Sequence, residues 1–99
     1  MTIDEIRKLF PSALRIAREN AGLSQQTAAR QAGVDQLTLD NHESGKNLPK
    51  LEHFLAELKA YGMDFMSFHE FLLQARLVKR IQALERKIRA MENQRTEKK

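Results

Sequence analysis

The chain of 99 residues contains no cysteine and no tryptophan, and has only four glycines, two prolines, five phenylalanines and one tyrosine. The lack of cysteine excludes disulfides and thiolate metal sites. So few glycines and aromatic residues argue against an all-β architecture. No apolar run approaches the roughly 20 residues that span a bilayer, and the N-terminus lacks the basic start and apolar core of a signal peptide. We therefore expect one soluble, cytoplasmic domain with at most an appended element.

Positive charge is unevenly distributed along the chain. The formal net charge is +4, which suggests a nucleic-acid partner. Residues 1–68 carry eight Lys/Arg and nine Asp/Glu, a net charge of −1, whereas residues 69–99 carry nine and four, a net charge of +5. All of the excess positive charge therefore lies in the last third of the chain.

Apolar residues recur at helical spacing almost throughout, and no strand-like alternation of useful length appears. The sequence therefore predicts an all-α fold, with helices over residues 2–9, 12–20, 25–31, 36–43, 49–61 and 65–93. Pro11 is expected to end the first helix and to start the second. Ser24, Asp35 and Asp64 are the expected N-caps, with a Ser67–Glu70 capping box as another start for the last helix. The inward side chains of the fifth helix are expected to be Leu51, Phe54, Leu55 and Leu58.

Two short helices joined by a glycine-containing turn have the geometry of a helix-turn-helix. Residues 10–68 resemble the lambda-repressor-like helix-turn-helix family of phage repressors and Cro proteins. The matching segments are "GLSQ" (Gly22–Gln25), "AGV" (Ala32–Val34), "ESGK" (Glu43–Lys46), Pro49 and "AYGM" (Ala60–Met63). The resemblance implies a five-helix, DNA-binding bundle, to which a long C-terminal helix is appended.

The resemblance also implies which residues contact DNA, because the second helix of the motif lies in the major groove in this family. By position, the residues facing bases are Gln36, Leu37 and Asn41, and Thr38 reaches a base or a phosphate. Gln and Asn side chains can bond to an adenine edge, and Leu can touch a thymine methyl group. Backbone phosphate is expected to lie against Ser24 and Gln25 at the start of the first motif helix, and against Lys46 and Asn47 after the second.

The second motif helix also fits an alternative in which it keeps the helix-turn-helix fold but does not bind DNA. Residues 33–45 contain three acids and no Lys or Arg. Asp35 is explained as an N-cap, and the resemblance implies that Glu43 forms a structural ion pair with Arg18. Asp40 remains unexplained, since it would either accept a hydrogen bond from cytosine or repel phosphate. In this alternative, Leu37 and Thr38 are ordinary helix residues and Lys46 is a solvated loop charge.

His42 stands where the resemblance implies a large apolar residue facing the core. We expect it to be partly buried, with a backbone partner for a ring nitrogen, and a pH-sensitive switch is the alternative. His53 and His69 lie on separate predicted helices without metal-ligand spacing, and no glycine-rich phosphate loop or Ser-His-acid grouping is present. The sequence therefore predicts no enzyme activity, no metal site and no cofactor.

The last predicted helix carries an apolar stripe at spacings of 4, 3, 4 and 3, formed by Leu77, Ile81, Leu84, Ile88 and Met91. Ile at position a with Leu at position d favours a two-stranded parallel coiled coil. A parallel pair would set Arg80 against Glu85 of the partner subunit, and Lys87 against Glu92. The alternative is packing on the chain's own core, which is plausible as far as Leu77. Phe68, Phe71 and Leu72 are expected to enlarge the dimer interface.

Together these patterns predict a helix-turn-helix domain over residues 1–68, a coiled-coil dimerisation helix over 69–95 and a basic disordered tail over 96–99. The predicted function is that of a sequence-specific DNA-binding transcriptional regulator, acting as a repressor. It would bind double-stranded DNA as a homodimer on a near-palindromic operator. Two alternatives are a protein-interaction module, favoured by the net negative charge of residues 1–68, and an antitoxin that represses its own gene.

Overall fold

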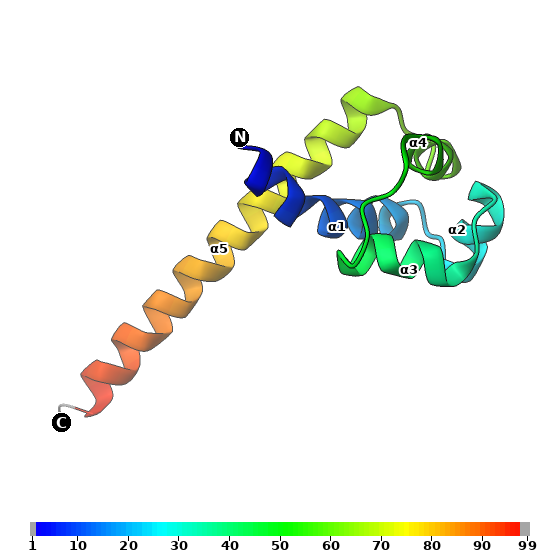
Figure 1. Ribbon diagram of the computed structural model, residues 1–99. Helices are drawn as coiled ribbons and strands as arrows, with labels where there is room; N and C mark the ends of the chain where they lie inside the picture. Colours follow the sequence, from blue (N-terminus) through cyan, green and yellow to red (C-terminus); the bar gives the residue numbers. More distant parts are fainter. Residues whose placement is uncertain (1, 98–99) are drawn as a thin grey trace.

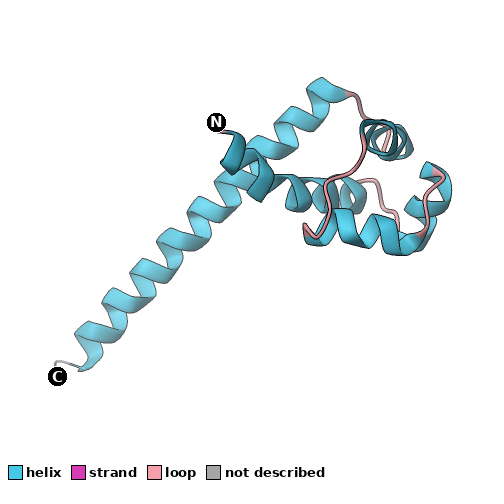
Figure 2. Cartoon of the chain, in the orientation of Figure 1, coloured by secondary structure: helices cyan, strands magenta, loops and turns pink. Residues whose placement is uncertain are grey.

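The computed structural model describes residues 2–97, and the surroundings of the side chains of residues 2–94. Within these residues the regular structure consists of α1 (Ile3–Asn20), α2 (Gln25–Ala32), α3 (Gln36–Ser44), α4 (Leu51–Ala60) and α5 (Phe65–Glu97). Short loops join the helices (Figure 2). The first four helices gather with the start of α5, whose remainder extends away from them (Figure 1), and the molecule measures 59 × 27 × 22 Å. The all-α prediction is confirmed.

Side-chain caps lie at the start of four helices, and the three that the sequence predicted begin α2, α3 and α5. The hydroxyl of Ser24 accepts a hydrogen bond from the Thr27 N–H at 3.2 Å, and the carboxylate of Asp35 accepts one from the Thr38 N–H at 2.7 Å. The Asp64 carboxylate accepts from the Ser67 N–H at 2.9 Å, so α5 begins at Phe65 and the alternative start at a Ser67–Glu70 box is wrong. Each of these bonds satisfies a backbone donor that the first helical turn leaves without a partner.

The first helix corrects the prediction made from Pro11. Instead of two helices over residues 2–9 and 12–20, one helix of 18 residues continues through the proline. A proline inside a helix removes one backbone hydrogen bond and costs about 3 kcal/mol. Leu9 and Ala13, on either side of it, are both buried in one core cluster, and this shared packing favours a continuous helix.

Aromatic rings from three helices form the centre of the larger core cluster. Phe10 of α1, Phe54 of α4 and Phe68 of α5 lie within 5.0–5.3 Å of one another between ring centroids. Leu72 is also buried here, and Phe71 packs against the cluster. The prediction that Phe68, Phe71 and Leu72 enlarge a dimer interface is therefore wrong, because these side chains pack within their own chain.

A second core cluster holds the helix-turn-helix together through small side chains. Ala17 of α1, Ala28 and Ala29 of α2, Leu39 of α3 and Tyr61 after α4 are all buried in it. Small residues allow the helix axes to approach closely.

The predicted inward face of α4 is partly wrong. Leu51 and Leu55 are 64% and 42% exposed, whereas the helix buries Phe54, Glu57 and Leu58. Because Glu57 takes a place in the interior, the buried face of α4 is rotated away from Leu51 and Leu55. The next buried residue of this face is Tyr61, directly after the helix.

Beyond the core, α5 extends into a region where no other helix that the structure describes covers it. It continues without a break past residue 68, the predicted domain boundary, and its last buried residue is Ala75. The helix extends to Glu97, and the disordered tail over residues 96–99 stays a prediction. Lys98 and Lys99 lie outside the described residues. The division at residue 68 stays a prediction.

Candidate nucleic-acid interface

A buried ion pair fixes α3 against α1. The Arg18 Nε atom lies 2.7 Å from Glu43 Oε2, and Nη2 lies 3.0 Å from Oε1, so the pair is bidentate. Arg18 also donates through Nη1 to the carbonyl of Leu23, at 2.7 Å, in the turn before α2. The hydrogen bond to Glu43 raises the pKa of Arg18, against the opposing effect of burial. One guanidinium thus positions both helices of the motif.

The outward face of α3 presents the residues that were predicted to read bases. The helix buries Leu39, His42 and Glu43 on its inner side. Gln36 and Leu37 stand at its open N-terminal end, where Leu37 is 68% exposed. Thr38 and Asn41 are half-buried. Apolar Leu37 therefore faces solvent on a helix that the chain already anchors from behind.

Asp40, which the sequence left unexplained, has a defined partner. The side-chain amide of Gln25, at the start of α2, donates to Asp40 Oδ1 at 3.1 Å and to Glu43 Oε1 at 3.2 Å. An open hollow beside α3 is lined by Gln25, Gln36, Leu37 and Asp40. The structure thus joins Gln25, a predicted phosphate contact, to α3, because the Gln25 amide nitrogen donates to two acids of that helix.

The residues predicted to bind backbone phosphate form two clamps, Ser24 with Gln25 and Lys46 with Asn47, at the ends of the motif. At the start of α2, the Ser24 hydroxyl is engaged with Thr27, so the backbone N–H groups and the positive end of the helix dipole are what it offers to an anion. After α3, the Asn47 N–H donates to the Asn41 carbonyl at 3.3 Å, and both Lys46 and Asn47 are exposed. The first clamp presents backbone donors and the second a free charge.

Gly45 ends α3 and shapes the second clamp. Its φ of +82° lies in the left-handed region, which side chains disfavour. A Cβ atom at this position would lie 3.2 Å from Pro11 Cγ, so the turn packs closely against α1. The turn that carries Lys46 therefore has little room to move toward the core.

His42 is buried, with only 4% of its surface exposed. Its Nδ1 lies 3.1 Å from Glu57 Oε1 on α4, so the prediction of a backbone partner is wrong. Burial raises the pKa of Glu57, and the hydrogen bond with His42 opposes this shift. Glu57 was missed by the sequence reasoning, although a Glu between Phe54 and Leu58 on an apolar face is a recognisable sign of a buried acid.

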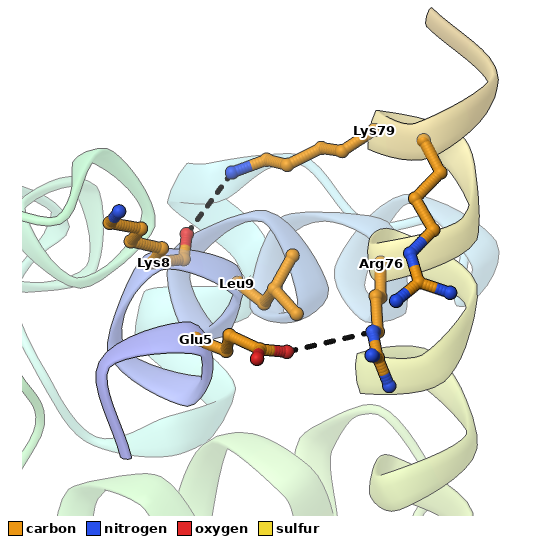
Figure 3. Close-up of a pocket in the computed structure, with 6 residues that line it drawn as sticks. Glu5, Lys8, Leu9, Arg76 and Lys79 are labelled. Carbon is orange, nitrogen blue, oxygen red and sulfur yellow. Dashed lines mark hydrogen bonds and ion pairs between the residues drawn. The ribbon is translucent and has the colours of Figure 1, made fainter. Parts of the chain in front are cut away.

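Two contacts hold α5 against the start of α1 (Figure 3). Arg76 Nε lies 3.5 Å from Glu5 Oε2, and Lys79 Nζ donates to the carbonyl of Lys8 at 3.3 Å. They border a pocket of about 280 Å³, which is also lined by Leu9 and Arg80. These contacts lie where α5 leaves the bundle.

Comparison with protein families shows a match to a helix-turn-helix domain over residues 12–64. The match covers more than half of the chain and includes α2, α3 and α4, and it is consistent with the lambda-repressor-like resemblance. No curated protein and no solved structure gave a significant match. Among the described residues no helix is long and apolar enough to cross a membrane. A helix-turn-helix domain points to a DNA-binding regulator. The chain belongs to the helix-turn-helix domain family.

Proposed function

We propose that this protein is a sequence-specific transcriptional regulator that represses by occupying a near-palindromic operator as a homodimer. The observation that carries the proposal is the outward face of α3, which presents Gln36 and Leu37 from a helix anchored by Arg18 and Glu43. The protein would act by binding DNA in the cytoplasm and not as an enzyme. Repression needs only that the bound dimer blocks a promoter.

Base reading and phosphate binding fall to different residues in this proposal. Gln36 and Asn41 would bond to base edges, and Leu37 would contact a thymine methyl group. The start of α2 and Lys46 would lie against backbone phosphates. Because residues 1–68 carry a net charge of −1, few counterions would be released. We therefore expect modest affinity and a shallow dependence on salt concentration.

The stripe on α5 supports a dimer. Leu77, Ile81, Leu84, Ile88 and Met91 are between 46% and 61% exposed in the single chain. Full burial of one such side chain contributes about 1.5–3 kcal/mol. A parallel pair would bury the stripe of both copies and set Arg80 against Glu85 of the partner subunit. Two motifs related by the two-fold axis would then meet half-sites about one helical turn apart.

Selection of duplexes from a random library tests the DNA-binding proposal. We expect enrichment of a near-palindromic sequence at low salt. Gln36→Ala and Asn41→Ala should relax the preference at single positions, whereas Lys46→Ala should weaken binding to all sequences alike. Failure to enrich any sequence over random duplex would contradict the proposal.

Sedimentation of the full chain tests the dimer separately. We expect twice the chain mass of 11.5 kDa at the concentrations at which the protein binds DNA. A single-chain mass at those concentrations would rule out the homodimer while leaving DNA binding by a monomer open.

A protein-interaction module, including an antitoxin that represses its own gene, is the second candidate. Its support is the negative charge of residues 1–68 and the exposed carboxylate of Asp40 on α3, which would suit a basic partner. Recovery of one stoichiometric protein from cells, together with no duplex binding in vitro, would favour this candidate over the first.

A further inference from the structure

Asp40 carries an unneutralised charge on the face of α3 that was assigned to DNA. The two other acids of the motif are engaged, since Asp35 caps α3 and Glu43 pairs with Arg18. Among the described residues, Asp40 forms no ion pair, and its hydrogen-bond partner is the neutral amide of Gln25. A carboxylate held here would repel phosphate, so its presence calls for a donor in the bound partner.

The position of Asp40 places it beside the other candidate reader at the start of α3. Asp40 follows Gln36 by four residues, so the two side chains share one face of the helix. Both line the open hollow together with Leu37 and Gln25. A base edge that meets Gln36 and Leu37 would therefore lie within the surroundings of the carboxylate.

We propose that Asp40 is a base-reading residue that selects cytosine, an inference that rests on the proposed DNA-binding function. An ionised carboxylate only accepts hydrogen bonds. In the major groove cytosine displays the N4 amino donor, whereas guanine displays two acceptors and thymine displays one acceptor and a methyl group. Adenine places the N7 acceptor beside its N6 donor, which opposes a carboxylate. Cytosine is therefore the base whose edge matches Asp40.

Gln25 acts as a positioning residue for this carboxylate. Its amide nitrogen donates both to Asp40 and to Glu43, and Glu43 is itself held by Arg18. The chain of contacts runs from the buried guanidinium to the surface acid. Asp40 Oδ1 is held by Gln25, which leaves Oδ2 to accept the hydrogen bond from the base.

Selection from a random duplex library with full-length variants tests the inference. The wild type should enrich cytosine at one position of each half-site, by about tenfold over other bases, as for one base contact. Asp40→Ala should lose this preference and keep the others. Asp40→Asn should shift it toward adenine, because the amide can both donate to N7 and accept from N6. Gln25→Leu should weaken the preference at the same position.

Glu52→Gln is the matched control, since it removes one exposed acid from α4, away from the hollow. It should leave every positional preference unchanged. If the wild type selects no sequence, the proposed function itself fails. If the wild type selects a sequence and Asp40→Ala keeps all of its preferences, the inference is overturned although DNA binding stands. A uniform gain in affinity for Asp40→Ala, with no change in preference, would identify Asp40 as a phosphate-repelling charge. Circular dichroism of each variant separates these outcomes from loss of fold.

Discussion

The two ends of the molecule differ in which side chains they bury and which they expose. The helix-turn-helix bundle buries charged or polar residues, namely Arg18, His42, Glu43 and Glu57, each with a partner from the same chain. The outer part of α5 exposes five apolar side chains of one stripe, and no described residue of the chain covers them. The buried charged and polar residues of the bundle therefore have partners within the chain, whereas the outer part of α5 has apolar surface that a second molecule can cover.

The largest effect on stability is expected from breaking the ion pair between Arg18 and Glu43 in the bundle. Glu43→Ala would leave the Arg18 guanidinium, whose side chain is only 11% exposed, without its carboxylate. Removing one partner of a buried ion pair costs about 3–5 kcal/mol, because the remaining charge stays desolvated. We expect a loss of that size in the free energy of unfolding, measured by chemical denaturation.

Glu19→Ala provides the control for this prediction. Glu19 also lies near arginines, 3.6 Å from Arg15 and 4.0 Å from Arg18, but its side chain is 58% exposed. Its removal should cost less than about 1 kcal/mol. Equal losses for the two variants would mean that burial does not distinguish these pairs.

The next largest effect is expected at the exposed stripe of α5. Ile81→Asp would place a charge in the proposed dimer interface of both subunits. Burial of one such apolar side chain contributes about 1.5–3 kcal/mol, and one is lost from each subunit. The dimer dissociation constant should therefore rise about a hundredfold or more. Sedimentation over a range of protein concentrations measures this change.

The neighbouring Gln82→Asp adds the same charge outside the stripe. It should leave the dissociation constant within a few-fold of the wild type. If both variants dimerise as the wild type does, the stripe is not the interface, and the contrast between the two ends of the molecule loses its functional meaning.

The same contrast explains how far the sequence could predict the structure. Periodicity predicted helices at the positions of α2, α3 and α5, and side-chain chemistry predicted the caps Ser24, Asp35 and Asp64. These features depend on neighbouring residues. The merging of two predicted helices through Pro11 depends on a shared core and was not predicted.

Pairs of polar residues that are distant in the sequence were also not predicted from residue spacing. The pairing of His42 with Glu57 crosses from α3 to α4, and the pairing of Gln25 with Asp40 from α2 to α3. Residue spacing shows which side chains share a face of one helix, but not which face of another helix they meet. Arg18 and Glu43 were expected to pair because the lambda-repressor-like resemblance implies such a pair, and their atoms lie 2.7 Å apart.

A smaller effect is expected at the second buried acid of the bundle. Burial raises the pKa of Glu57 above its ordinary value of 4.5, so ionisation is less favourable in the folded than in the unfolded chain. Below that ordinary value the acid is protonated in both states and causes no penalty. As pH rises through the raised pKa, the wild type therefore loses stability.

Glu57→Gln cannot ionise and retains an oxygen that can accept a hydrogen bond from His42. Its free energy of unfolding relative to the wild type should therefore increase from about pH 4.5 upward, and then level off. Urea denaturation of both proteins across this range provides the measurement. A relative stability that falls with rising pH would show that the ionised pair with His42 outweighs burial. His53 and Glu43 are also close enough to influence the pKa of Glu57, and both are unchanged in the two proteins.

The smallest effect on stability is expected where the two ends of the molecule join. Arg76→Met removes the contact with Glu5, in which both side chains are partly exposed, at 33% and 43%. Such pairs contribute about 0.2–1 kcal/mol. The same contact helps to set the direction of α5 relative to α3, and in a dimer that direction determines the distance between the two reading helices. We therefore expect a small loss of stability together with a broader tolerance for half-site spacing.

Binding to operators whose half-site spacing differs in steps of one base pair measures this tolerance. Arg86→Met removes the same charge farther along α5, at an exposed position away from the pocket that joins α5 to α1. This variant should keep the spacing preference of the wild type. An equally sharp preference in Arg76→Met would assign the direction of α5 to the apolar core alone. Phe68, Leu72 and Ala75 are the α5 residues that would then suffice, because they already bury this helix against α1 and α4.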